Sequence, residues 1–422
     1  MLETFHRLWP ALEMGDWLNR RRVMAYAAIL LAFEVLAFLF VTAGTYGLVV
    51  PLDRPNTTDF VSFYAAGTLA DSGAAQASYD HAQHLAAEES ATQHGIGYVL
   101  FVYPPVFMLI CSVLARLPYL AAFTLFEAAT LIPCLYLVRS ILQEKGWRAF
   151  VPLLAFPAVA IDIGMGQNAM LTAALFGGAT LLIDRRPFVA GLLFGALCYK
   201  PHFGLLVPIA LIAAGRWRAV FGAAVSVAGL VGLSAAVFGI DTWRAFLVAF
   251  TGSHAIYESG QVDFAAFVSS FGAVRLMGGS PALAYFVQGV ASLTAAGLVA
   301  IVWRRNTSLP VRAATLAAGT LVALPLILFY DFIIAGVAMA WLIRAARQNG
   351  FLPWEKLLLL GIFLAPMLAR GIGTSLHLPI GAIAGYALLG LCAMRAFREI
   401  RAGQPIDRLV PHSAGMSALA AG

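Results

Sequence analysis

Residues 20–43 read RRRVMAYAAILLAFEVLAFLFVTA, three arginines followed by an apolar run in which Glu34 is the one charged residue. A run of about 20 apolar residues has the length of one membrane-crossing helix. The run continues past Phe40 without a clear small-residue cleavage site, so we interpret it as an uncleaved signal anchor. This stretch predicts that the fold is built in a membrane.

The rest of the chain repeats the pattern. Of its 422 residues, 61% are hydrophobic and 11% are charged, whereas soluble domains carry about 25% charged residues. Further apolar runs lie at 119–142, 149–165, 168–183, 187–200, 203–214, 218–238, 285–303, 312–329, 332–343, 355–370 and 379–396. We therefore expect an all-α integral membrane protein with about 12 transmembrane helices. Residues 1–400 would form a single domain, and residues 401–422 a disordered cytoplasmic tail.

Basic residues at the ends of the runs predict the orientation, because Lys and Arg gather on the cytoplasmic side of membrane proteins. All the basic connectors share one side, and both termini are cytoplasmic, if the short apolar segment 106–115 does not cross. We therefore interpret 99–118 as a juxtamembrane or re-entrant segment. Two long loops, 44–118 and 240–284, then lie on the opposite, outer face. The basic connectors are at 20–22, 145, 148, 185, 186, 216, 218, 304, 305, 312, 344, 347 and from 395 onward.

Composition also limits the partners and cofactors. The net charge of +6 comes from arginines at the ends of apolar runs, so we expect no nucleic-acid partner. The four cysteines lie in apolar stretches at unrelated spacings, and a Gly-rich nucleotide-binding fingerprint is missing from the sequence. We expect neither a metal ion nor a cofactor. The cysteines are Cys111, Cys134, Cys198 and Cys392.

Two acidic residues are candidates for function, because ionisable groups at membrane depth are costly. Asp59 follows the sequence PNTT at 55–58, just outside the first run. It is either the N-cap of a helix or a general base for a hydroxyl nucleophile. Asp331 lies between two runs with an apolar flank on each side, so the cost of burying its charge favours a functional role.

Two turns on the outer face carry polar side chains. Gln167 and Asn168 end the turn GMGQN at 164–168 and offer amides suited to a sugar, although a turn that satisfies its own backbone explains them equally. Lys200 and His202 lie in the sequence YKPH at 199–202, which interrupts an apolar stretch. Snorkelling explains a Lys near a helix end but not the interruption. A cation beside a freed helix end predicts binding of a phosphate.

Other polar residues on the outer face have two interpretations each. Arg116, Arg275 and Arg370 oppose the charge bias and are either phosphate ligands or ion-pair partners. A polar cluster in the second long loop is either solvated or faces a substrate; it consists of His254, Tyr257 and Glu258. Together these groups favour one chemistry, in which Asp59 deprotonates an acceptor hydroxyl while cations neutralise a leaving lipid phosphate.

Four short stretches together resemble glycosyltransferase family 87: TDFVSFYAAG at 58–67, YPP at 103–105, GQN at 166–168 and KPH at 200–202. The resemblance covers most of residues 23–345. It implies a GT-C fold with periplasmic juxtamembrane helices, in a multi-pass protein of the bacterial inner membrane whose active site faces the periplasm. It also implies an inverting enzyme that moves a sugar from a polyprenyl-phosphate donor to a lipid or glycan acceptor, with Asp59 as the catalytic base. Tyr64 and Tyr103 lie in these motifs and are further candidates for substrate binding.

The chain departs from that family at residues 328–332, which read LFYDF where mycobacterial members carry a Ser-Trp-x-His-His type stretch. The sugar, mannose or another hexose or pentose, and its acceptor are therefore left open. The alternative function is a membrane transporter of a lipid-linked or polar substrate, which about twelve spans with broken helices would suit. Against it, we see no inverted repeat, and the polar groups crowd one face. A non-catalytic scaffold would not need Lys200 and Asp331 at costly positions.

Overall fold

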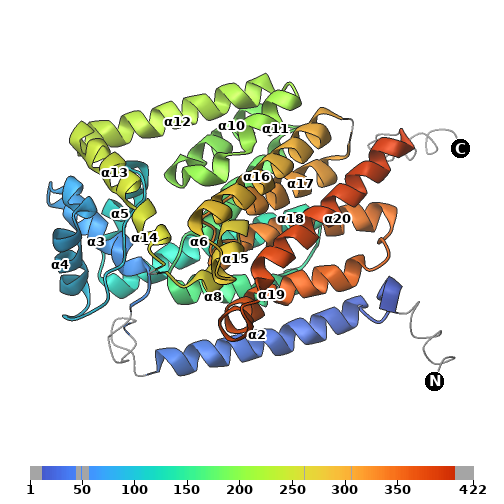
Figure 1. Cartoon of the computed structure of the whole chain (residues 1–422), viewed down its shortest axis with the longest axis horizontal. Coiled ribbons are helices and arrows are strands. Elements are labelled where there is room, and N and C mark those ends of the chain that lie inside the picture. The colour runs from blue at the N-terminus through green and yellow to red at the C-terminus, as the bar shows by residue number, and fades with distance from the viewer. Residues whose placement is uncertain (1–11, 44–48, 50–56, 261, 306, 404–422) are drawn as a thin grey trace, which may run out of the picture.

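The computed structural model describes residues 12–43, 49, 57–260, 262–305 and 307–403. Within these residues the regular structure is helical, apart from isolated bridge residues such as the antiparallel pair Phe267 and Leu328. Long helices lie side by side, and shorter helices cover one end of them (Figure 1). The predicted all-α class is confirmed.

In the described part of the chain, seven helical segments are long and apolar enough to cross a membrane, and a bent pair would make an eighth. The bent pair joins the segment 147–154 to the segment 157–165 at an angle of 70°. The seven segments are α2 (Arg20–Thr42), α6 (Tyr119–Leu142), α12 (Trp217–Phe238), α16 (Pro281–Arg304), η6 (Phe329–Phe332) with α18 (Ile333–Asn349), α19 (Glu355–Leu376) and α20 (Ile380–Ala402). The bent pair contains η2 (Trp147–Ala149), α7 (Phe150–Leu154) and α8 (Pro157–Met165).

The other four predicted runs form apolar helices of only 10–17 residues, shorter than the roughly 20 residues of an ordinary span. The count of twelve crossings is therefore not confirmed by length and composition. Proline stands at the start of three of the four short segments, at Pro187, Pro201 and Pro310, because it lacks an N–H and starts helices more readily than it continues them. The short segments are α9 (Ala169–Leu182), α10 (Pro187–Ala196) with η3 (Leu197–Tyr199), η4 (Pro201–Gly204) with α11 (Val207–Ala213), and α17 (Leu309–Ala323).

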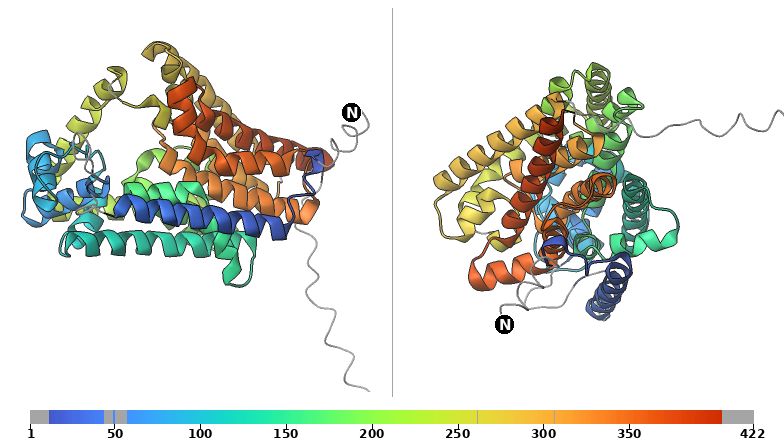
Figure 2. Two further views of the ribbon diagram at one scale, coloured as in Figure 1. Left: turned by 90° about the horizontal axis from the view of Figure 1, so that it is seen from below. Right: turned by 90° about the vertical axis from the view of Figure 1, so that its right-hand side faces the viewer.

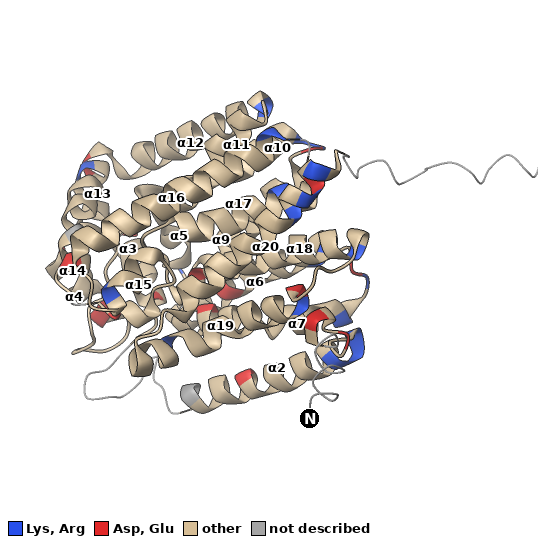
Figure 3. Ribbon diagram, turned by 45° about the vertical axis from the view of Figure 1, so that its right-hand side comes forward, with Lys and Arg blue, Asp and Glu red and all other residues tan. Residues whose placement is uncertain are grey.

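Ion pairs tie the basic connectors together at one end of the bundle. Glu144, just after α6, pairs with Arg20 at the start of α2 at 3.1 Å and with Arg347 near the end of α18 at 2.8 Å. Asp184 likewise pairs with Arg216 and Arg312. Lys and Arg gather at this end, where α2 begins and α20 ends (Figures 1 and 3).

The Arg20–Glu144 pair also fixes the course of the chain between α2 and α6. Since the start of α2 meets the end of α6, the segment between these helices starts and finishes at the other end of the bundle. The helix in the segment 99–118 is α5 (Pro105–Leu114), about 15 Å long and too short for a bilayer core of about 30 Å. The length is compatible with the prediction that 99–118 does not cross the membrane, which stays a prediction.

The two segments predicted as long loops fold into short helices. Helices α3, α4 and α13 lie at the end of the bundle opposite the basic connectors (Figures 1 and 2). The first segment contains α3 (Phe60–Asp71), η1 (Ala75–Tyr79), α4 (His81–Ala91) and α5, and the second contains α13 (Ile240–Gly252), α14 (His254–Glu258), η5 (Phe264–Ala266), α15 (Ser270–Leu276) and the start of α16. At the C-terminus, α20 continues through Ala402, and most of the predicted tail lies outside the described residues.

Candidate functional site

Asp59 lies immediately before α3, at the position of an N-cap, but within the described residues its side chain makes no capping bond to the helix. Its backbone N–H donates to the carbonyl of Met165 at 2.7 Å. Its carboxylate accepts a hydrogen bond from Nε2 of Gln167, also at 2.7 Å. The N-cap interpretation therefore holds for the position of the residue and not for the carboxylate, which faces the turn after α8.

Gly166 allows this close contact. It ends α8 in the left-handed conformation, with φ +66°, which favours glycine. A Cβ at this position would lie 2.8 Å from Cβ of Phe60, the first residue of α3. The glycine of the GQN motif thus both closes the helix and lets α3 approach, and these two effects bring Asp59 beside Gln167.

Tyr103 orients the Gln167 amide. Its hydroxyl donates to Oε1 of Gln167 at 3.2 Å, so the amide presents its NH₂ group to Asp59. The ring of Tyr103 is itself held edge-on to Phe63, with ring centroids 5.3 Å apart. Burial keeps the pKa of the Tyr103 phenol well above its usual range, so the hydroxyl stays a neutral donor.

Lys200 and Asp331 form a buried ion pair. Nζ of Lys200 donates to Oδ1 of Asp331 at 2.6 Å and to Oδ1 of Asn168 at 3.2 Å, and both charged residues are at most 5% exposed. The ammonium also lies over the rings of Phe203 and Tyr330, at 5.2 and 5.4 Å from their centroids. An unpaired charge at this depth would be costly, so each charge accounts for the burial of the other.

The site residues from five separate stretches thus join in one hydrogen-bonded arrangement, which we call the polar network. The backbone N–H of Asn168 approaches Oε1 of Gln167 at 3.4 Å and so links the Asp59 side of the network to the Lys200 side. The polar network consists of Asp59, Tyr103, Gln167, Asn168, Lys200 and Asp331.

Two nitrogen atoms beside Lys200 are buried and make no hydrogen bond of normal geometry within the described residues: Nδ2 of Asn168, whose side chain lies near the phenol of Tyr103, and Nε2 of His202. Leaving a buried polar atom unpaired costs about 1–3 kcal/mol. The amide nitrogen is a donor, so a ligand oxygen at this point would supply what the protein does not. The Asn168 and His202 side chains are therefore suited to an oxygen-rich group such as a sugar or a phosphate.

The surroundings of Asp59 shift its acidity. Burial raises the pKa of its carboxyl above the usual range, while the hydrogen bond from Gln167 and the charge of Lys200 lower it, and the charge of Glu88 on α4 raises it further. Burial dominates, so the pKa is raised on balance. Since a carboxylate with a raised pKa is a stronger base, this environment suits proton abstraction.

Residues 101–328 match the model of glycosyltransferase family 87, which is more than half of the 422-residue chain. The chain belongs to glycosyltransferase family 87. It is therefore a glycosyltransferase, and its long apolar helices make it a membrane protein. No curated protein and no solved structure matches the chain.

Four members of the polar network lie inside the part that matches family 87, namely Tyr103, Gln167, Asn168 and Lys200. Asp59 and Asp331 lie outside it, one before and one after. Each is joined to the matching part by a short hydrogen bond, through Gln167 and Lys200 respectively.

Several predicted site residues lie apart from the polar network. Tyr64 donates to the carbonyl of Leu117 at 2.8 Å. Arg370 pairs with Asp263 at 2.8 Å, and Arg116 pairs with Asp71 at 2.9 Å, so each has the ion-pair partner of the alternative interpretation.

The predicted polar cluster of the second loop lies on and around α14. Arg275 donates to the backbone carbonyls of Gly279 and Glu258, at 2.9 and 3.3 Å. The carboxylate of Glu258 accepts from the hydroxyl of Tyr285 at 3.4 Å. Tyr257 packs edge-on against Phe267, and burial raises the pKa of its phenol. The side chain of His254 lies outside the described part of the chain.

Sequence reasoning missed two residues that support the turn at 164–168 and the start of α9. Asp162 accepts hydrogen bonds from the backbone N–H groups of Ala169 and Met170, at 3.1 and 3.3 Å, and so fixes the start of α9. The hydroxyl of Tyr199 bonds to Thr172 at 2.6 Å. Asp162 lies within an apolar run, so the criterion that selected Asp331 would also have selected it.

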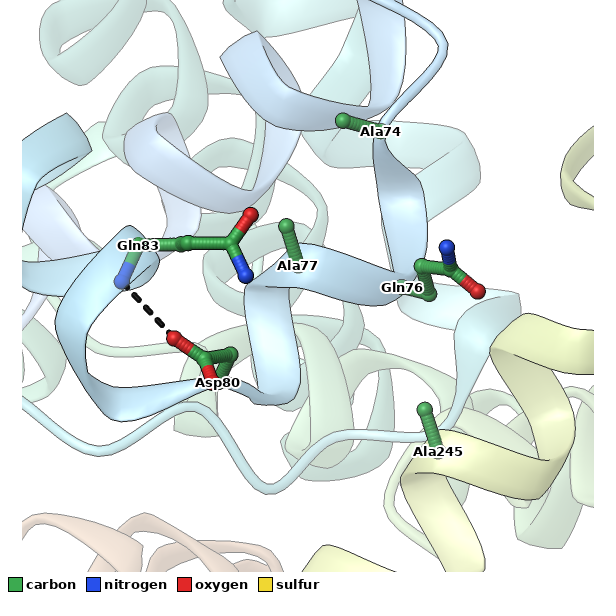
Figure 4. Close-up of a pocket in the computed structure, with 6 residues that line it drawn as sticks. All are labelled: Ala74, Gln76, Ala77, Asp80, Gln83 and Ala245. Carbon is green, nitrogen blue, oxygen red and sulfur yellow. Dashed lines mark hydrogen bonds between the residues drawn. The ribbon is translucent and has the colours of Figure 1, made fainter.

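A surface depression of about 270 Å³ lies elsewhere, between η1, α4 and α13 (Figure 4). Asp80 in its wall accepts a hydrogen bond from the backbone of Gln83 at 3.0 Å and caps α4. The lining residues are Ala74, Gln76, Ala77, Asp80, Gln83 and Ala245, and none of them belongs to the polar network.

Proposed function

We propose that this glycosyltransferase moves a sugar from a polyprenyl-phosphate-linked donor to a hydroxyl group of a lipid or glycan acceptor, with Asp59 as the general base. The observation that carries the proposal is the carboxylate of Asp59, held by Gln167 in the same polar network as the buried Lys200. The assignment to family 87 supports glycosyl transfer over transport. The long apolar helices support a donor that reaches the site from the bilayer.

In the proposed reaction the acceptor oxygen attacks the anomeric carbon of the donor sugar. Asp59 takes the proton of the acceptor hydroxyl as the new C–O bond forms. The bond between the anomeric carbon and the phosphate oxygen breaks, and polyprenyl phosphate leaves with the electron pair. The raised pKa of Asp59 favours this proton transfer.

The donor phosphate would bind beside Lys200. The unpaired nitrogens of Asn168 and His202 support this placement, because phosphate and sugar oxygens would satisfy them. We further propose that Tyr103 and Gln167 contact the sugar. Arg275 and Arg370 would add positive charge only after giving up part of their present contacts with backbone carbonyls and with Asp263.

The proposed orientation places the polar network on the outer face of a bacterial inner membrane and both termini in the cytoplasm. The clustering of Lys and Arg at the end where α2 begins supports this, since that end is the cytoplasmic one by charge (Figure 3).

The test is Asp59→Asn in purified protein, assayed with polyprenyl-phosphate sugars, mannose first. The amide cannot accept the proton, so transfer should fall by about 100-fold or more while the donor still binds. Asp71→Asn, at the far end of α3 and paired with surface Arg116, is the matched control and should transfer normally. Full activity of the Asp59 variant would exclude this residue as the base.

A further inference from the structure

A second cluster of polar side chains is buried between α3 and α4, outside the polar network. Oγ of Ser62 lies 3.1 Å from Nε2 of His84, and the same nitrogen lies 3.4 Å from Oε1 of Glu88. Oε2 of Glu88 accepts a hydrogen bond from the backbone N–H of Val99 at 3.2 Å. The three side-chain residues are at most 1% exposed, and we call them the α3–α4 cluster.

The composition of α4 makes this burial unusual. The structure describes the whole of α4, and of its residues only His84 and Glu88 are buried. They are four positions apart and share one face of the helix. A helix that merely covered α3 would bury apolar side chains there, since burying a carboxylate is costly. The two fully buried side chains of α4 are polar instead, beside the partly buried Leu85 that packs against the core, which points to a role beyond packing.

The α3–α4 cluster holds the neighbourhood of Asp59 from two sides. Ser62 belongs to the first turn of α3, and its N–H donates to the backbone carbonyl of Asp59 at 3.2 Å. On the other side, Glu88 anchors Val99, four residues before Tyr103, whose hydroxyl orients the amide that binds Asp59. The cluster therefore connects to both the backbone of Asp59 and the partner of its carboxylate.

We propose that Ser62, His84 and Glu88 are positioning residues, which hold the carboxylate of Asp59 in place for proton transfer. Ser62 and His84 act through the first turn of α3. Glu88 acts through the segment that ends at Tyr103 and through its negative charge. The inference rests on the proposed role of Asp59 as the base.

The charges around Asp59 are consistent with this. Glu88 raises the pKa of Asp59, and Lys200 lowers it. The other titratable groups that face Asp59 are phenols, those of Tyr103, Tyr119 and Tyr330. The groups that face Glu88 are His84 and the phenols of Tyr98 and Tyr119. Glu88 is thus the nearby carboxylate whose removal would change the electrostatics of the base.

The first test is Glu88→Gln, read as the protonation of Asp59 by infrared titration of the purified protein, with Asp59→Asn as the spectral reference. The amide oxygen can still accept from Val99, so the variant should fold. The midpoint of Asp59 should move to lower pH by about 0.5 unit or more, because a like charge is lost. Glu89→Gln, a neighbour on α4 that pairs with the exposed His94, should leave the midpoint unchanged.

An unchanged midpoint in Glu88→Gln, or equal shifts in both variants, would overturn the electrostatic part of the proposal. The titration needs no turnover, so its outcome is independent of whether the protein transfers the sugars offered. If the proposed function of Asp59 as the general base is wrong, the Asp59→Asn variant should instead retain full transfer activity.

The second test is Ser62→Ala, which removes one hydroxyl, beside His84→Ala and His84→Gln. If the cluster positions the base, the kcat for transfer should fall by about 10-fold in His84→Ala with the donor KM within twofold, and less in Ser62→Ala. His84→Gln should recover part of kcat, because its amide can reach Ser62. Equal losses in both histidine variants, or a loss seen only in KM, would contradict positioning. His94→Ala, in the exposed segment that follows α4, is the control.

Discussion

Nε2 of Gln167 donates a 2.7 Å hydrogen bond to Oδ2 of Asp59, across 108 positions of sequence. The bond joins α3 to the turn between α8 and α9, and it is the only side-chain hydrogen bond that the described residues give to the proposed base. Its direction depends on Tyr103, because a Gln amide that donates from one end must accept at the other. This hydrogen bond therefore both positions the carboxylate of Asp59 and lowers its pKa against the larger, opposite effect of burial.

Gln167→Leu should lower transfer and move its acid limb to higher pH. Loss of the donor removes an interaction that lowers the pKa of Asp59, so the already raised pKa rises further. The base is active when ionised, at pH values above its pKa, so activity is lost at a higher pH than in the wild type. The measurement is kcat/KM against pH. An acid limb that stays in place would show that Gln167 does not bind the ionised carboxylate.

Tyr103→Phe should also lower transfer and move its acid limb to higher pH, but by less than Gln167→Leu does. Without the hydroxyl the Gln167 amide loses the partner that fixes its orientation, and it can turn its oxygen toward Asp59, where it repels the carboxylate. We expect a loss of about fivefold in kcat/KM, since one neutral hydrogen bond contributes about 1 kcal/mol. Tyr64→Phe, whose hydroxyl binds a carbonyl of the loop before α6 instead, should stay near wild type.

Gly166→Ala should destabilise the protein by at least about 2 kcal/mol and reduce transfer. A left-handed backbone costs a non-glycine residue about 1–2 kcal/mol, and the new Cβ would lie 2.8 Å from Cβ of Phe60, which cannot rotate away. Thermal unfolding and transfer rate both report the change. Gly164→Ala is the matched control, since nothing lies within 4 Å of a Cβ there. Equal stability of the two variants would refute the close-approach argument.

The sequence alone predicts the membrane class, and it selects the turns that meet at Asp59. Apolar runs and the positions of Lys and Arg depend on local composition, so they can be identified without knowledge of tertiary contacts. The GQN and KPH stretches are similarly visible, because glycine, proline and buried polar groups mark local breaks. All twelve predicted runs are helical, although four of them form helices too short to be confirmed as spans.

The sequence does not show which polar and charged residues contact each other in the fold. Lys200 and Asp331 each stand out as costly charges, but their mutual neutralisation follows from the packing of η6 against the break between η3 and η4. Arg370 was a phosphate candidate because it opposes the charge bias on the outer face, and its ion-pair partner Asp263 is 107 positions away. The α3–α4 cluster was invisible because His84 and Glu88 look like ordinary surface residues of a polar helix until α4 is seen against α3.

The Lys200–Asp331 pair allows structure and ligand binding to be separated. Lys200→Met or Asp331→Leu alone should each cost about 3–5 kcal/mol of stability, because the remaining charge is buried without a partner. The double variant removes both charges, so its free energy of unfolding should lie within about 1–2 kcal/mol of the wild-type value.

Binding of polyprenyl phosphate distinguishes a structural from a ligand-binding role of Lys200. If Lys200 binds the phosphate, the stable double variant should bind polyprenyl phosphate about tenfold more weakly than the wild type, or worse. Asp331→Asn, which leaves the ammonium uncompensated, should bind the same lipid more tightly than wild type. Wild-type affinity in the double variant would instead mean that Lys200 is a structural partner of Asp331, and that the unpaired nitrogens of Asn168 and His202 bind the donor without it.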